Sequence, residues 1–460
     1  MRGISYLILG AVTGATACSV YDSSLLGRAA SSAGGAGGST AGSGGSGATS
    51  SGGGTNSSGG SSGAAAYCLG APQKTFPPKP PPQKNDAGKD DVEAVSVQYT
   101  IDLGDSNPVS GDTSRYRTIG FDLDKFCSAG ATLTSFGECL LPSGDPGVLD
   151  GPGGVDNALG GVIQKVRDLI GSFSSENYTT ALQTGASNII YRISQWNGQA
   201  NDDQVLVETY VAAPFDSIDN PKGSSPKWAG NDVWPIASDS VNGGVRANSR
   251  YRDANAYVAN YQVVASLKST SLRLDVGLSN LGDVKLDMLL RGSIIVCNLE
   301  PTDAGPWGWN AVSCTLGGRW RADDLVHQLG QFPNPSITDH RAPLCTQAVT
   351  YPTFKANICQ QIDTYSGING IADATTECDS LSMGVYWTSR PAILGDVYTV
   401  NALVDPCPAN QDPANDSCFT DAGAILGAGG TGGGGGTDAG PSHKDAGADG
   451  GKTRDASADH

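Results

Sequence analysis

Alternating apolar and polar positions recur along the middle of this chain and predict β-strands. In residues 95–103 every second side chain is apolar, as expected of a strand with one buried face. Similar runs, or short apolar runs between turn residues, are 117–123, 189–196, 205–211, 257–267, 272–278, 284–290, 294–299 and 383–388. Short strands separated by turn residues are typical of an antiparallel β-sandwich.

Helical patterns are few. Residues 156–170 carry one apolar stripe at helical spacing, and the carboxylate of Asp156 suits the N-cap because it can accept from the first free amides. Shorter helices are predicted at 323–332 and 354–365. These segments are too scattered for repeated strand–helix–strand units. The predicted fold class is therefore mainly β, an antiparallel β-sandwich of jelly-roll-like type with a few inserted helices.

The first residues have the features of a bacterial export signal. Arg2 is followed by an apolar run that ends at Ala17, and this run is shorter than the roughly 20 residues of a membrane span. The segment resembles a lipobox, in which the cysteine, here Cys18, is S-acylated and becomes the mature N-terminus. Ala15 stands where lipoboxes prefer Leu. Ordinary cleavage after Ala17 is the competing route and leaves Cys18 without lipid.

Low-complexity sequence flanks the part of the chain that can fold. Gly, Ser and Ala dominate residues 29–66 and a Pro-rich stretch follows, which predicts a flexible linker that ends in a stiffer polyproline II segment. The end of the chain repeats Asp-Ala-Gly with almost no large apolar side chains, which predicts disorder. We divide the chain into a signal peptide (1–17), the linker (18–91), a disulfide-stapled β-rich body (92–418) and a disordered tail (419–460).

The eleven cysteines form an odd count, which leaves one of them unpaired in an oxidising compartment. If Cys18 carries lipid, the other ten can form five bridges. Those ten are Cys68, Cys127, Cys139, Cys297, Cys314, Cys345, Cys359, Cys378, Cys407 and Cys418. Spacing alone does not determine connectivity. Pairing sequence neighbours gives Cys127–Cys139, Cys297–Cys314, Cys359–Cys378 and Cys407–Cys418, and leaves Cys68 for Cys345.

The net charge of −17 argues against nucleic acid and anionic lipid headgroups as partners. Only six of the 46 acidic residues are glutamates. Asp favours turns whereas Glu favours helices, so this imbalance fits a loop-rich β protein.

Candidate catalytic residues are scarce. The body holds two histidines, His327 and His340, and no serine in a nucleophile-elbow context, so both histidines are interpreted as surface or capping residues. Glycoside hydrolysis needs two carboxylates at a fixed separation, and Glu208 and Glu300 lie on or beside predicted strands. The alternative for both is the solvated face of a strand. The cysteines are assigned to bridges, so no zinc site is expected.

Four aspartates form the pattern that most favours a metal. Asp122 and Asp124 alternate with apolar residues, and Asp150 and Asp156 enclose a Gly-rich turn. Together they could present hard oxygens to Ca²⁺, which takes about six to eight. The twelve-residue EF-hand loop is absent from the sequence. The ordinary alternative places the first two on the polar side of a strand, Asp150 in a turn and Asp156 at a helix cap.

Trp307 and Trp309 lie in a Gly/Pro loop and are candidate ligand-binding residues. Aromatic side chains on a loop can stack on sugar rings, as in carbohydrate-binding sandwiches. They can equally fold back over the sheet.

The layout resembles secreted lipoproteins of the myxobacterial type, which share the cysteine at the end of the leader, the Gly/Ser/Thr linker, the cysteine-bearing body and Asp-Ala-Gly tracts. Residues 120–124, 150–160 and 378–382 add to the likeness. The resemblance implies a location and no activity. By similarity to bacterial lipoproteins, Ser19 in place of Asp after the cysteine favours the outer membrane.

We therefore expect an exported protein of the outer membrane or cell surface, anchored through lipid on Cys18, with a binding or structural role. Its candidate partners are a surface glycan or another envelope protein, and no cofactor is expected beyond a structural calcium ion. The alternatives are an extracellular polysaccharide hydrolase and a soluble secreted protein without lipid.

Overall fold

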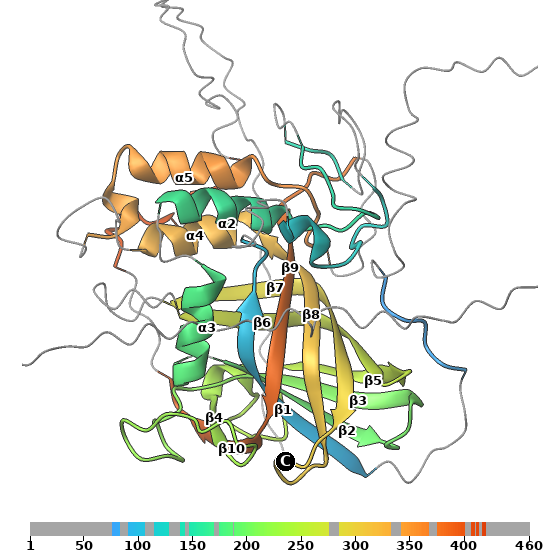
Figure 1. Cartoon of the computed structure of the whole chain (residues 1–460). Coiled ribbons are helices and arrows are strands. Elements are labelled where there is room, and N and C mark those ends of the chain that lie inside the picture. The colour runs from blue at the N-terminus through green and yellow to red at the C-terminus, as the bar shows by residue number, and fades with distance from the viewer. Residues whose placement is uncertain are drawn as a thin grey trace, which may run out of the picture. The chain divides into compact units, whose positions relative to one another are not determined.

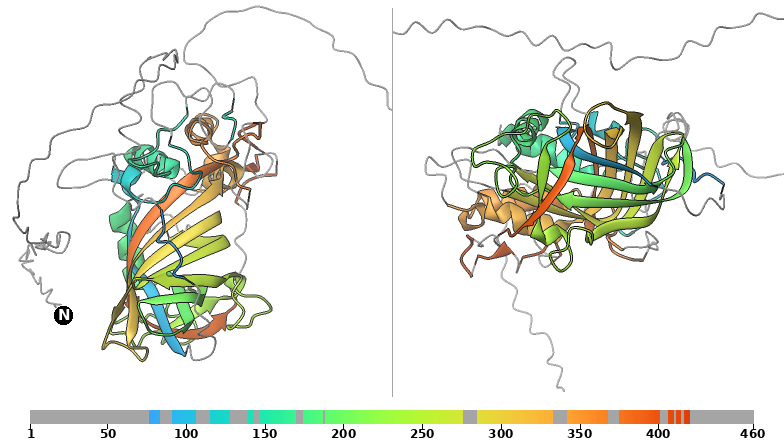
Figure 2. Two further views of the ribbon diagram at one scale, coloured as in Figure 1. Left: turned by 90° about the vertical axis from the view of Figure 1, so that its right-hand side faces the viewer. Right: turned by 90° about the horizontal axis from the view of Figure 1, so that it is seen from below.

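Eight antiparallel strands close on themselves to form the centre of the fold (Figures 1 and 2). The structure, a computed structural model, describes residues 76–82, 91–105, 115–127, 139–142, 147–169, 174–186, 188–275, 285–332, 342–367, 375–400, 406–409, 411–413 and 416–419, all within the unit Gly59–His460. In barrel order the strands are β1 (Val92–Asp102), β2 (Ile189–Trp196), β3 (Asn201–Val211), β5 (Tyr251–Ala259), β6 (Gln262–Asp275), β7 (Lys285–Pro301), β8 (Trp309–Arg321) and β9 (Ser380–Pro391).

β1 is the strand that closes the barrel. Its residue Ser96 pairs with Tyr191 of β2 on one side and with Pro391 of β9 on the other. The predicted mainly β, antiparallel class with a few helices is confirmed. The strands form one closed barrel and not the two stacked sheets of the predicted jelly-roll-like sandwich. Apolar alternation reports which residues of a strand are buried, and it contains no information about which strands pair at the edges.

The strand boundaries differ from the predicted runs in several places. The start of the run 272–278 belongs to β6, which already begins within the run 257–267. The run 257–267 is two strands, because Asn260 and Tyr261 form the turn between β5 and β6. The runs 284–290 and 294–299 are one strand, β7, and β8 was not predicted. The predicted strand 117–123 is wrong: a short 3-10 helix, η2 (Arg115–Thr118), is followed by an irregular loop.

Three helices lie together at one end of the barrel, at the top of Figure 1. They are α2 (Ala158–Leu169), α4 (Ala322–Gln331) and α5 (Thr350–Cys359). The prediction of Asp156 as the N-cap of α2 is wrong, because Asn157 takes that role: its Oδ1 accepts from the amide of Gly160 at 3.1 Å. Helix α5 ends earlier than the predicted segment 354–365.

A fourth helix, α3 (Ser175–Thr184), was not predicted and packs against β1 and β6 (Figure 1). The pairing of β1 with β2 ends at Val97. At the end of β1, side chains of α3 accept hydrogen bonds from the backbone amides. Thr179 Oγ1 accepts from Ile101 N at 3.1 Å, and Ser175 Oγ accepts from Leu103 N, just after the strand, at 2.9 Å. The helix therefore completes the wall where β1 no longer has β2 beside it.

The two faces of β1 belong to different cores. Ala94 belongs to the large core, which includes the fully buried Trp196 and Trp387. Val95 and Val97 belong to a second core with Trp234 and Ile236 of β4 (Val233–Ala237). β4 pairs in parallel with β10 (Ile393–Tyr398), and this small sheet covers the second core. Within the described residues no helix is both long and apolar enough to cross a membrane.

Four disulfides join the described parts of the body. They are Cys139–Cys378, Cys297–Cys314, Cys345–Cys407 and Cys359–Cys418. The predicted pair Cys297–Cys314 is confirmed, because β7 and β8 place the two residues directly opposite each other.

The other pairings predicted from sequence neighbours are wrong. They are Cys127–Cys139, Cys359–Cys378, Cys407–Cys418 and Cys68–Cys345. In each case at least one member bonds to a cysteine brought close by the fold. Cys127 is disulfide-bonded as well. Cys18, Cys68, the leader, most of the linker and the residues after 419 lie outside the described residues.

The bridge Cys139–Cys378 should stabilise the fold more than Cys297–Cys314. Loop-closure entropy gives about 5 kcal/mol for the first, which spans 239 residues, and about 3 kcal/mol for the second, which spans 17. All four cysteines are buried, so the cavities left by substitution are comparable. Denaturant unfolding of Cys139→Ala/Cys378→Ala and of Cys297→Ala/Cys314→Ala measures both losses. A larger loss for the second pair would contradict the prediction.

Candidate metal centre

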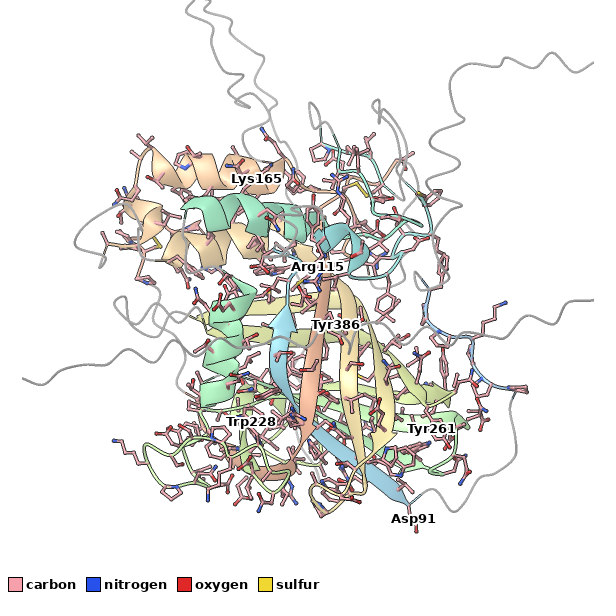
Figure 3. The ribbon with its side chains drawn as sticks, in the orientation of Figure 1. Asp91, Arg115, Lys165, Trp228, Tyr261 and Tyr386 are labelled. Carbon is pink, nitrogen blue, oxygen red and sulfur yellow. A yellow bond between two sulfur atoms is a disulfide. The ribbon has the colours of Figure 1, made fainter. Side chains whose placement is uncertain are left out.

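Two loops meet against the barrel next to the helical end. One loop, 115–127, includes η2, and the other, 147–157, leads into α2; Figure 3 labels Arg115 at the start of the first. The buried side chain of Asn157 joins these loops to the sheet, since its amide nitrogen donates to three backbone carbonyls. The three belong to Tyr116 (3.0 Å), Ile119 (3.0 Å) and Gly384 of β9 (3.1 Å).

Glycine allows the close approach at two points. A Cβ atom on Gly384 would lie 2.0 Å from the carbonyl oxygen of Ile119, so no other residue lets the first loop reach β9. Gly154 has φ +81°, and a Cβ there would lie 3.0 Å from Asp122 Oδ2. The Gly-rich turn therefore holds the second loop against the acidic residues of the first.

Three of the four predicted aspartates come together here. Carboxylate oxygens of Asp122, Asp124 and Asp156 all lie within 4.8 Å of one another. Backbone amides of the first loop orient these groups: Asp156 Oδ2 accepts from Leu123 N at 2.7 Å and from Asp124 N at 3.3 Å. Asp122 Oδ1 accepts from Lys125 N at 2.6 Å. We refer to Asp122, Asp124 and Asp156 as the aspartate triad.

The aspartate triad combines burial with like charge. Asp156 is 2% exposed and Asp124 is 7% exposed. Burial, followed by the charge of Asp124, raises the pKa of Asp122 to about 7. Burial also raises the pKa of Asp156 well above its usual range, and Asp124, Asp150 and Asp363 add to the rise. Loss of hydration and mutual repulsion both disfavour the ionised carboxylates.

Asp150 and Asp363 extend the negative charge around the triad. Asp150, the fourth predicted residue, is buried, and its charge raises the pKa of both Asp156 and Asp363. Asp363 was not predicted. Its Oδ1 accepts from Ser382 N at 2.7 Å, and burial raises the pKa of its carboxyl well above the usual range. Asp363 precedes β9 in sequence and is held beside the start of that strand, where Thr364 pairs with Ser380, so no local spacing could have indicated it.

The two glutamates proposed as a catalytic pair lie on strands that are not neighbours. Glu208 on β3 is 1% exposed, and its Oε2 lies 3.2 Å from Arg192 on β2. Arg192 also bonds Glu93 of β1 at 2.9 Å, so the three side chains form an ion-pair network across adjacent strands. Glu300 lies near the end of β7 and is exposed. The structure does not bring Glu208 and Glu300 together on one pair of strands.

The two tryptophans of the β7–β8 turn pack against different cores. Trp307 donates from Nε1 to the carbonyl of Ala392 at 2.8 Å and contacts the second core. Trp309 lies edge-on to Trp196, with ring centroids 4.8 Å apart, and stacks with Tyr261 at 5.6 Å. Both side chains fold back onto the body, the second of the two alternatives that the sequence left open.

The histidines show no catalytic arrangement in the described part of the chain. His327 Nε2 on α4 lies 3.0 Å from Gln331 Nε2 and 3.9 Å from Asp412 Oδ1, at the surface of the helical end. His340 lies outside the described residues.

Comparison with known protein families, with curated protein sequences and with solved structures finds no match for this chain. What the site binds must therefore be inferred from its own side chains.

Without metal, the triad should make stability fall as pH rises. The pKa of Asp122 in the folded protein is about 7, against an ordinary value of 3.8, so the folded state binds this proton more tightly. Binding of this proton therefore stabilises the folded state fully below about pH 4, and that stabilisation is lost as the pH rises through about 7. In EDTA, Asp122→Asn should melt a few degrees above the wild type at pH 8 and together with it at pH 4. A variant that melts at or below the wild type at pH 8 would contradict this.

Proposed function

We propose that this chain is a lipid-anchored protein of the cell envelope with a binding or structural role, and that its aspartate triad holds a structural Ca²⁺ ion. The observation that carries the calcium proposal is the set of three carboxylates within 4.8 Å of one another, two of them buried. Buried carboxylates this close need either protons or a cation to offset their repulsion.

The charges around the triad favour a bound cation over protons alone. The charges of two further aspartates, Asp150 and Asp363, raise the pKa of Asp156. Arg319 is the buried cation next to the first loop, and its guanidinium donates to the carbonyl of Leu123 at 2.7 Å. The exposed Lys125 also acts on Asp122, but Arg319 and Lys125 together can balance at most two of the five carboxylates. A divalent ion supplies the missing charge.

The donor set favours calcium among the divalent ions. The triad offers carboxylate oxygens only, and neither His nor Cys belongs to the group. Oxygen-only sites suit Ca²⁺ and Mg²⁺ and disfavour Zn²⁺. Irregular loops with several carboxylates and nearby carbonyls suit the larger and more flexible coordination of Ca²⁺. A bound ion would join the loop after β1 to the loop that leads into α2.

The cysteines support export and the lipid anchor. All nine described cysteines are disulfide-bonded, as expected in an oxidising compartment and not in a cytosol. The total of eleven is odd. One cysteine is therefore left over, and Cys18 at the end of the leader has the sequence context for acylation.

Calcium should raise the melting temperature, and the rise should depend on the triad. A ligand at about 100 times its Kd adds about 2.7 kcal/mol to the free energy of unfolding. Differential scanning calorimetry of the wild type in EDTA and in Ca²⁺ measures the effect. Asp124→Asn keeps the acceptor that Phe126 N uses and removes one charged ligand, so the rise should be lost. Asp303→Asn, an exposed aspartate in the β7–β8 turn, is the matched control and should keep it. Equal wild-type melting temperatures in EDTA and Ca²⁺ would refute the calcium site.

The lipid anchor is tested by partitioning the protein made in a Gram-negative host between Triton X-114 and water. The wild type should enter the detergent phase and incorporate labelled palmitate. Cys18→Ala should lose both properties, and Cys68→Ala should keep them. A wild-type protein that stays in water without label would instead support the soluble secreted alternative.

A further inference from the structure

The turn between β5 and β6 places an aromatic ring in a strained position. Asn260 has φ 54° and Tyr261 has φ 61°, so both residues of this two-residue hairpin turn are left-handed. Asn with Gly is the usual pair in such a turn, because a bulky side chain is unfavourable in the left-handed region. Strain of this kind persists where the surrounding structure holds it, and it clusters at functional sites.

The backbone of Tyr261 is held from both sides. Its amide donates to the carbonyl of Ala200 in the β2–β3 turn at 2.9 Å, and its carbonyl accepts from Leu299 N of β7 at 2.8 Å. Asn260 N donates to Asn201 Oδ1 at 3.1 Å. The ring therefore has a fixed place at the end of the barrel away from α2 and α5, at the lower right of Figure 3.

The ring of Tyr261 is exposed and is supported from below. It is 40% exposed, and it stacks on Trp309 with ring centroids 5.6 Å apart and 19° between the planes. Trp309 in turn lies edge-on to the fully buried Trp196. One end of this aromatic column is anchored in the core, so the outer ring presents a flat apolar face at little entropic cost.

Polar groups lie next to the turn that carries the ring. A cavity of about 300 Å³ adjoins the same turn, and its lining includes Lys79, Asn197, Asn201, Asp203 and Asn260. On strands β6 to β8, Gln262 Nε2 donates to Asn298 Oδ1 and Asn298 Nδ2 donates to Ser313 Oγ, both at 2.8 Å. An apolar surface with a few polar groups beside a cavity of this size is the usual make-up of a small-ligand site.

A sugar chain fits these features better than a protein surface. A pyranose has one face of C–H groups that can lie on an aromatic ring, and its hydroxyls can bond amides and carboxylates at the edge. The other exposed apolar side chains of the lower loops, Ile218 (51%) and Val245 (53%), stand on separate loops between β3 and β5, whereas a protein interface needs a continuous apolar centre. Asp203 and the net charge of −17 disfavour an anionic sugar.

We propose that the stacked Tyr261–Trp309 pair and the adjoining cavity bind a neutral polysaccharide, with Tyr261 against the face of one sugar ring. This inference rests on the proposed binding role and names the ligand class for it. It gives the strained tyrosine a function, and it places the binding site away from the aspartate triad.

Full-length protein is titrated with cellohexaose, chitohexaose, maltohexaose and xylohexaose in constant Ca²⁺, using calorimetry and tryptophan fluorescence. At least one should bind. Tyr261→Gly places the favoured residue in the turn, so its melting temperature should equal or exceed that of the wild type while binding weakens by at least about tenfold. Tyr261→Leu keeps the strain and the apolar character without a flat ring, and it should lose binding as well. Val349→Ala, at an 80% exposed position near α5, is the control and should bind normally.

Three results would overturn the inference. They are no binding by any of the four sugars, undiminished binding by Tyr261→Gly, and full binding by Tyr261→Leu, which would point to a protein partner in place of a sugar. The calcium-dependent melting and the detergent partitioning are separate readouts. If both give the expected results while none of the sugars binds, only the polysaccharide inference is wrong, and the proposed envelope role is unaffected.

Discussion

Repulsion between buried carboxylates is the constraint on which the helical end of this protein depends. Five aspartates influence one another there, and at least three of them are nine-tenths buried or more. A low-dielectric site makes each added negative charge costly unless a proton or a cation offsets it. The loops at this end are therefore stable at neutral pH only if protons or a cation offset that charge, and the proposed Ca²⁺ ion would do so.

The barrel supplies the rigid support for that site. β9 carries Gly384, against which the first loop packs, and Ser382, which bonds Asp363. Asn157 joins β9 to both loops and caps α2 at the same time. Since β9 also pairs with β1 to close the barrel, the strand that supports the aspartate triad is also a strand of the barrel closure. A change in the charge of the triad should therefore change the free energy of unfolding of the whole body.

Much of the fold and part of the site could be predicted from the sequence. Alternation gave the mainly β class, and local spacing brought Asp122, Asp124, Asp150 and Asp156 to attention because two short loops carry all four. Asp363 and the wrong disulfides have a common cause: they depend on contacts between distant segments. The Thr-rich α3 lacks a strong apolar stripe, and its visible signals were only the caps Ser174 and Gly185. Tyr261 was missed because the turn Asn260-Tyr261 lacks glycine and the run 257–267 looked like one strand.

The most direct test of the calcium site is a crystal structure of the protein grown with Ca²⁺, with an anomalous difference map. One strong peak is expected between the carboxylates of Asp122, Asp124 and Asp156, with oxygen ligands at about 2.3–2.6 Å. A map without such a peak, in which the three carboxyls share protons or bond a lysine or arginine side chain directly, would contradict it.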